Sequence, residues 1–237
     1  MDSTFVIAID GPAGSGKSTL ARKLAASLGW RFLDTGVLYR AMAVAASSRG
    51  LADAGEGELT ALARSLDIRL SLERDLSRVS VDGLDVTGEL RTQAISALAS
   101  RMASMAGVRD SLRDLQRRVG AGGRLVTEGR DQGTAIFPEA RLKFFLVASP
   151  EARAGRRLRE LQTRGRDDTL EQVLAEMLAR DRQDAGRRKD PLREAPDAVR
   201  VDSTDLDEDQ VLALMLARAR EVFGEVAMPA GGGSEPR

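Results

Sequence analysis

A glycine-rich segment near the start of the chain has the composition of a phosphate-binding loop. Residues 11–18 read Gly-Pro-Ala-Gly-Ser-Gly-Lys-Ser and match the pattern G-x-x-x-x-G-K-[ST] in full. Glycines let the backbone turn so that successive N–H groups point at phosphate oxygens, and the lysine reaches the β- and γ-phosphates. The Ser18 hydroxyl is the expected protein ligand of Mg²⁺. The segment predicts an ATP site formed by Gly11, Pro12, Ala13, Gly14, Ser15, Gly16, Lys17, Ser18 and Thr19.

The segments on either side of this loop have the patterns needed to position it. Residues 5–10 form a continuous apolar run, which is typical of a strand buried on both faces. Residues 17–28 place Leu20, Leu24 and Leu28 on one stripe of a helix. The N-terminal end of that helix would face the phosphates with its positive dipole end. This context favours a functional loop over a chance match.

The rest of the chain alternates between strand and helix patterns. Strands are predicted at 31–34, 125–128, 143–147 and 198–202, and helices at 37–48, 108–119, 150–164, 169–184 and 207–223. Such alternation predicts an α/β P-loop fold of three layers, in which helices cover both faces of a five-stranded parallel sheet.

Residues 59–105 interrupt this alternation. The stretches 68–72 and 78–82 alternate like half-exposed strands, with turn residues around Asp75 and Gly83. We therefore expect a small α+β insert within a kinase-like core that spans residues 1–224. The Pro/Gly-rich residues 225–237 are expected to form a disordered tail.

Composition narrows the chemistry and the partners. The chain has 237 residues, with 36 basic and 36 acidic side chains, and this balance argues against a general nucleic-acid binder. It contains no Cys and no His, which excludes thiol nucleophiles, zinc sites of those ligands and His-based triads. No apolar run approaches the ~20 residues that span a bilayer. With no signal-peptide pattern either, we expect a cytoplasmic enzyme without membrane contact.

The phosphate-binding loop alone leaves GTPases, motor-type ATPases and small-molecule kinases open. A GTPase would show Asn-Lys-x-Asp, which is absent, and residues 125–128 resemble the carboxylate-ended strand of a motor ATPase only weakly. Arginines near the ends of predicted elements favour a kinase with a second phosphate site: Arg40, Arg91, Arg109, Arg130, Arg180 and Arg187. Three polar residues, Arg180, Asp184 and Arg187, share one helix face, although a solvated, salt-bridged helix would show the same spacing.

Several segments in the same order resemble bacterial cytidylate kinases. The similarity covers residues 5–224 and is carried by residues 9–19, 33–40, 88–93, 108–109, 128–134, 180–192 and 202–204. Among them are Leu33-Asp-Thr-Gly-Val-Leu-Tyr-Arg40 and Glu128-Gly-Arg-Asp-Gln-Gly-Thr134, and several motifs in the correct order are far more specific than any one of them. The insert also falls where this family carries an extra domain on the nucleoside-monophosphate side. The resemblance implies an ATP-dependent, Mg²⁺-assisted transfer of phosphate to CMP and dCMP, by a monomer.

The resemblance also assigns residues to the acceptor nucleotide. Matching positions imply that Ser100, Arg109 and Asp131 read the cytosine and that Arg180 and Asp184 contact the sugar. The acceptor phosphate would be held by Arg40, Arg130 and Arg187, with help from the Thr35 hydroxyl. Lys17 and those three arginines would carry catalysis by neutralising charge on the moving group. The alternative for Asp131 and Asp184 is that each only orients a neighbouring arginine.

The sequence is compatible with alternatives for the lid, for two aspartates and for the function itself. An arginine-rich stretch before Gly165, with Arg156 and Arg157 as expected ATP ligands, predicts a lid, although a solvated helix face would look alike. Asp10 and Asp34 end strands near the loop and would either order magnesium-bound water or satisfy turn amides. The competing functions are a P-loop kinase for UMP, dTMP or shikimate, and a non-catalytic nucleotide-binding regulator.

Overall fold

A five-stranded parallel sheet forms the centre of the molecule. The computed structural model describes residues 5–72, 77–163 and 165–224, so the turn expected around Asp75 and the tail expected at 225–237 lie outside the described residues. The strands are β1 (Val6–Asp10), β2 (Arg31–Asp34), β6 (Leu125–Gly129), β7 (Leu142–Val147) and β8 (Val199–Asp202), in the spatial order β2-β6-β1-β7-β8. Every neighbouring pair is parallel. The predicted α/β sheet is thus confirmed.

The strands carry apolar side chains on both faces of the sheet, so both faces are covered by other elements. Ile7 and Ile9 of β1 pack on one side against α1 (Lys17–Leu28) and α8 (Glu208–Phe223). Val6 and Ala8 face the other side, where they pack against the segment that contains a π-helical turn, η3 (Gln132–Ile136). All five residues of β1 are buried, as expected for a central parallel strand.

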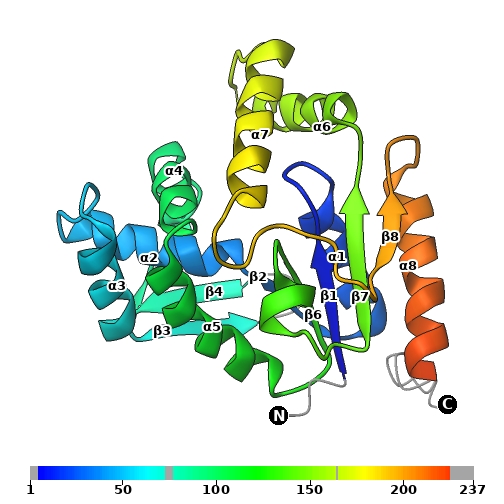
Figure 1. The fold of residues 1–237 in the computed structure, drawn as a ribbon, viewed down its shortest axis with the longest axis horizontal. Coiled ribbons are helices and arrows are strands. Elements are labelled where there is room, and N and C mark those ends of the chain that lie inside the picture. Colours follow the sequence, from blue (N-terminus) through cyan, green and yellow to red (C-terminus); the bar gives the residue numbers. More distant parts are fainter. Residues whose placement is uncertain (1–4, 73–76, 164, 225–237) are drawn as a thin grey trace, which may run out of the picture.

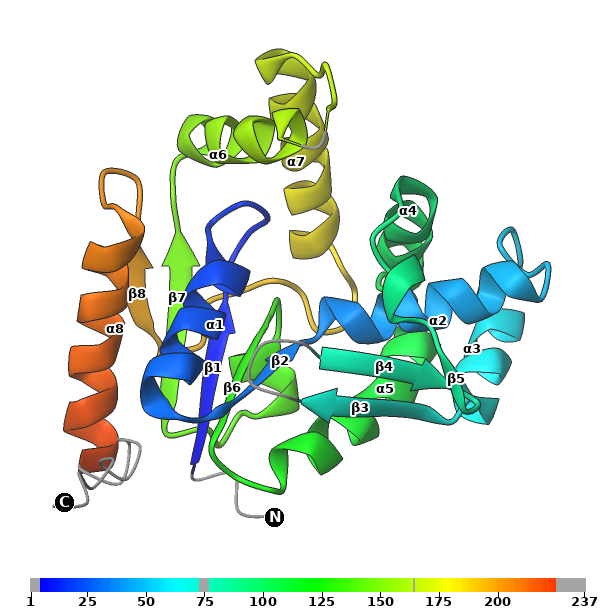
Figure 2. The same ribbon diagram turned by 180° about the vertical axis from the view of Figure 1, so that it is seen from behind.

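A second body of structure stands beside the main sheet (Figures 1 and 2). It contains the antiparallel strands β3 (Ile68–Leu72), β4 (Ser77–Val81) and β5 (Leu84–Asp85), and the helices α2 (Gly36–Ser48), α3 (Glu56–Ser65), α4 (Gln93–Met102) and α5 (Ala106–Gly120). A short 3₁₀ turn, η2 (Thr87–Glu89), precedes α4. The four helices and the strands β3 and β4 share one apolar cluster, with Met42, Leu59 and Met102 fully buried in it. The two predicted strands are present, whereas α3 and α4 were not located from the sequence.

A helical hairpin lies beyond the carboxyl ends of β7 and β8 (Figure 1). It consists of α6 (Pro150–Gln162) and α7 (Leu170–Ala185), which pack through Ala154, Leu161, Val173 and Met177. Ser149 caps α6 by accepting from Ala152 N–H, with a proline at the next position. Among the described helices, none is both long and apolar enough to cross a bilayer.

Candidate active site

The glycine-rich loop joins β1 to α1 and has the conformation that its sequence predicts. Gly11, Gly14 and Gly16 all have positive φ angles. A Cβ atom on Gly11 would lie 2.1 Å from the carbonyl oxygen of Leu146, so only glycine fits there. Gly16 precedes α1 as its N-cap in a left-handed conformation. The loop therefore ends at a helix N-terminus, where backbone N–H groups bind phosphate.

Lys17 folds back over the loop that carries it. Its Nζ donates to the carbonyl oxygen of Pro12 at 2.6 Å and to Ser15 Oγ at 3.3 Å. The side chain is buried, and this burial, followed by the charge of Arg130, lowers the pKa of Lys17 to about 7. The amino group is thus held over the loop in surroundings that disfavour its charged form. An anionic ligand bound there would stabilise the ammonium.

Two carboxylates lie side by side next to the loop. Asp34 and Glu128 are register partners on β2 and β6, and Glu128 Oε1 accepts a hydrogen bond from Ser18 Oγ at 2.8 Å. Burial, together with the nearby Asp34, raises the pKa of Glu128. A hydroxyl and carboxylates at a phosphate site are oxygen ligands of the kind Mg²⁺ prefers. The residues present therefore fit the predicted metal.

Asp10 satisfies the amides of a turn. Its two carboxylate oxygens accept from Gln132 N–H at 2.9 Å and from Gly133 N–H at 2.7 Å. Burial raises the pKa of Asp10 to about 7 in spite of these two bonds, which favour the ionised form. Of the two roles left open by the sequence, the structure supports the turn amides, and the turn follows directly after Arg130 and Asp131. Asp34 also accepts from an amide, that of Gly36, at 2.9 Å.

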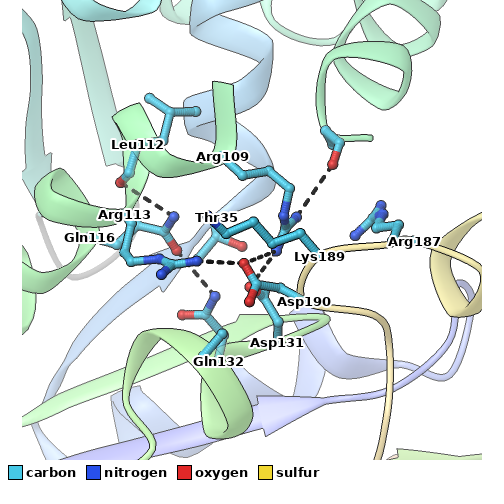
Figure 3. Close-up of polar contacts among 12 residues, drawn as sticks. Thr35, Arg109, Leu112, Arg113, Gln116, Asp131, Gln132, Arg187, Lys189 and Asp190 are labelled. Atoms are coloured by element: carbon cyan, nitrogen blue, oxygen red, sulfur yellow. Dashed lines mark hydrogen bonds and ion pairs between the residues drawn. The ribbon is translucent and has the colours of Figure 1, made fainter. Parts of the chain in front are cut away.

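Arg109 and Asp131 form a buried ion pair at the start of α5 and the end of β6 (Figure 3). Arg109 also donates to the carbonyl oxygen of Ala103 at 3.3 Å, while its Nε lies buried without a partner among the described residues. Burial raises the pKa of Asp131, and Arg109 opposes this rise. Asp190 approaches the same guanidinium to 3.7 Å. The predicted base-reading pair is therefore brought together, in a place largely closed to water.

The other predicted acceptor residues form a second group of charges. Asp184 is buried and pairs with both Arg130, at 2.8 Å, and Arg187. Burial opposes ionisation of Asp184, but the two arginines outweigh it and lower its pKa. The side chain of Arg180 is exposed to solvent. Desolvation by the neighbouring protein, followed by the charge of Arg130, nevertheless lowers the pKa of Arg180 to about 10. Several arginines thus share few carboxylates, and the excess positive charge favours binding of a further anion.

Two more predicted residues lie at the β2–α2 junction. Arg40 Nη1 lies 3.6 Å from Asp34 Oδ2, and the buried Thr35 donates its hydroxyl to the carbonyl oxygen of Glu128 at 2.8 Å. The charge of Arg40 also acts on Arg180. The junction therefore links the loop side of the site to the arginine group.

Three predicted residues are placed apart from these contacts. Ser100 lies half-buried on α4. Arg156 donates to Ser203 Oγ at 3.0 Å, after β8, and Arg157 pairs with Glu160 at 2.6 Å on an exposed face of α6. Among the described residues, the hydrogen bonds and ion pairs of these two arginines go to partners outside the glycine-rich loop.

Some residues of this site were missed by sequence reasoning. Glu128 was considered as the end of a weakly ATPase-like strand and within a matching segment, but it was not assigned to the site. Tyr39 lies among the charges of Arg109, Asp131 and Arg187, and burial raises its pKa to about 12. Arg153 belongs to the arginine-rich stretch predicted as a lid, and Asp181 to a matching segment. Their contacts with the loop were not predicted because they lie 140 and 168 residues from Ala13.

A phosphate-binding loop on a parallel sheet, faced by a group of arginines, defines a P-loop phosphotransferase. A family model described as cytidylate kinase matches residues 7–221. A cytidylate kinase from Geobacter sp. (strain M21) is 45% identical over 220 residues, which cover 93% of this chain and 94% of that protein. One from Syntrophotalea carbinolica is 46% identical over 91% of this chain and 92% of its own length. The chain belongs to the cytidylate kinase family.

Proposed function

We propose that this enzyme transfers the γ-phosphoryl group of ATP to the phosphate of CMP, and also of dCMP. The observation that carries the proposal is the buried pair of Arg109 and Asp131 next to the group formed by Arg130, Arg180, Asp184 and Arg187. A paired base-reading site beside a phosphate-binding group is what a nucleoside monophosphate requires. The names of the relatives agree with this acceptor.

The proposed base contacts depend on the hydrogen-bonding groups of cytosine. The exocyclic amine donates, so a carboxylate such as Asp131 is its natural acceptor, while N3 and O2 accept from a guanidinium such as Arg109. Ser100 would add a further hydroxyl contact. Uracil carries a carbonyl oxygen in place of the amine and would leave Asp131 poorly paired. A lost bond to a buried charged group costs about 1–3 kcal/mol, enough to discriminate between the two pyrimidines.

The proposed phosphate contacts need no general base. The attacking oxygen belongs to a phosphate monoester whose second pKa is about 6, so it is largely ionised at neutral pH. Arg40, Arg130 and Arg187, with Thr35, would hold that phosphate, while Lys17 would stabilise charge on the transferring group. Arg180 and Asp184 would contact the sugar; Asp184 also separates two of the arginines.

We propose Mg²⁺ as the metal, held by the Ser18 hydroxyl together with the phosphates of ATP. Glu128 and Asp34 would order water molecules around it, since Mg²⁺ keeps several waters when bound to nucleotides. The metal supplies neutralisation of charge on the β- and γ-phosphates. The protein's own part is to hold Ser18 in position, and its hydrogen bond to Glu128 does so.

We propose three further features of the enzyme: how the lid arginines reach ATP, its state and location, and the role of the insert. Arg156 and Arg157 would reach ATP by leaving their present partners, Ser203 and Glu160. The enzyme would be a monomer that acts in the cytoplasm on ATP and CMP, without nucleic acid or membrane, as the resemblance to bacterial cytidylate kinases implies. The 59–105 region would act as the acceptor-side insert of the core.

The experiment that tests the function is an ADP-release assay with Mg-ATP. The acceptor panel is CMP, dCMP, UMP, dTMP, AMP and shikimate, each measured at several concentrations. We expect turnover with CMP and dCMP, with UMP far behind. Binding of ATP without turnover of any acceptor would contradict the proposal and favour a non-catalytic regulator.

A further inference from the structure

The tip of the phosphate-binding loop is held by two side chains of the α6–α7 hairpin. Asp181 Oδ1 accepts from the backbone N–H of Ala13 at 3.3 Å, and Arg153 Nη1 donates to the Ala13 carbonyl oxygen at 2.9 Å. The same nitrogen of Arg153 donates to Asp181 Oδ2 at 2.6 Å. Both backbone polar groups of one loop residue are therefore engaged by a single ion pair, which we call the loop clamp.

The Arg153 side of the clamp is buried, Asp181 is partly buried, and packing supports both. The side chain of Arg153 is 5% exposed, and its Nε donates to the carbonyl oxygen of Ala148 at 3.1 Å. Ala13 packs against the apolar cluster of the hairpin. A Cβ atom on Gly14 would lie 2.5 Å from Met177 Cε. The loop tip is thus inserted against both helices. Removing only Asp181 would leave the buried Arg153 without its carboxylate partner, which is costly.

The same turn of α7 also faces the acceptor side. Arg180, directly before Asp181, feels the charges of Arg130 and Asp184. Successive residues of a helix point in different directions, so one helical turn presents a carboxylate to the ATP loop and a guanidinium to the arginine group. Helix α7 therefore connects the two phosphate sites through rigid structure.

We propose that Asp181 and Arg153 are positioning residues for phosphoryl transfer, which fix the tip of the phosphate-binding loop against α7 and so set its alignment with the acceptor arginines. Phosphoryl transfer depends mainly on the alignment of donor and acceptor, and small displacements cost large factors in rate. The acceptor half of this proposal rests on the proposed function. The donor half, the effect on ATP binding, does not.

The test compares Asp181→Ala, Asp181→Asn and Arg153→Lys with the wild type. Glu176→Gln is the matched control, because Glu176 is an exposed acid on the same helix. Calorimetry gives the Kd for Mg-ATP without acceptor, and the ADP-release assay gives kcat and both KM values. For Asp181→Ala we expect the Kd for ATP to rise about tenfold or more. We expect kcat to fall as well, while KM for CMP and the control stay within about twofold of wild type.

A double-mutant cycle of Asp181→Asn with Arg153→Lys separates a clamp from a general loss of structure. If the two side chains act as one unit, the double variant is little worse than either single variant. Additive effects on the Kd for ATP, or a folded Asp181→Ala with wild-type Kd and kcat, would overturn the proposal. If Asp181→Ala does not fold, the cycle decides. A wild type that binds ATP but does not use CMP would sink the acceptor assignment alone, because the Kd for ATP still tests the clamp.

Discussion

At the scale of single residues, the protonation of Lys17 is the feature with the clearest consequence. Burial and Arg130 lower its pKa to about 7 in the ligand-free protein, and a bound triphosphate would raise it again. ATP binding should therefore take up a proton above about pH 7, and apparent affinity for ATP should fall as pH rises further. Calorimetry in buffers of different ionisation enthalpy measures the uptake. Uptake that is absent in wild type, or unchanged in Lys17→Met, would contradict this assignment.

Asp131 is the residue on which the choice of pyrimidine is expected to depend. In Asp131→Ala, the kcat/KM for CMP should fall about 10- to 100-fold because the cytosine amine and Arg109 both lose their partner. UMP has no amine to lose and should gain in relative terms. The ratio of kcat/KM for CMP and UMP is the measurement, with thermal unfolding as the control for stability. An unchanged ratio in a folded variant would leave Asp131 as only a partner for Arg109.

At the scale of elements, the π-helical turn η3 depends on Asp10. Both carboxylate oxygens accept from turn amides, and an asparagine can supply only one acceptor. Asp10→Asn should therefore cost about 1–3 kcal/mol of stability. It should raise KM for CMP more than KM for ATP, since the turn follows Arg130 and Asp131. Urea unfolding and steady-state kinetics check the two effects; equal changes in both KM values would indicate that the loop, not the turn, is disturbed.

The connection after α7 is tied to α5 by two neighbouring ion pairs of different burial. Asp190 pairs with Arg113 and is mostly buried, whereas Lys189 pairs with Asp110 at 2.6 Å in contact with solvent. Because exposed pairs contribute little, Lys189→Gln should leave KM for CMP within about twofold. Asp190→Asn should raise it about three- to tenfold, since it loosens the segment that carries Arg187. Similar values for the two variants would show that this attachment has no role in acceptor binding.

At the scale of the whole molecule, the sheet was predictable and the ion pairs between distant elements were not. Buried strands such as residues 6–10 and 142–147 are recognisable as apolar runs, and the glycine loop identifies the turn and helix that come after β1. The helices α3 and α4 were not located. They are short and pack onto α2 and α5 rather than onto the main sheet. Contacts such as Arg153 with Asp181 depend on how two helices meet, which no local pattern encodes.

The single tryptophan offers a probe of global unfolding that lies apart from the site. Trp30 stacks edge-on against Phe223 of α8, with ring centroids 5.1 Å apart. Phe223→Ala should lower the free energy of unfolding by about 3–5 kcal/mol through loss of buried packing. Urea unfolding followed by Trp30 fluorescence measures this. At a temperature where Phe223→Ala is still folded, its KM values for ATP and CMP should equal those of the wild type. A selective change in KM for CMP would show that α8 influences the site.

The pairing of Asp184 with Arg130 and Arg187 has a consequence for the ligand-free enzyme. Cations gathered for a phosphate would repel one another when no phosphate is present, and here the chain supplies its own counter-ion. Substrate binding is then an exchange of partners on arginines that are already in place, rather than the ordering of loose side chains. Simple inorganic anions should consequently compete with the acceptor nucleotide, and they should do so without being needed to keep the empty enzyme folded.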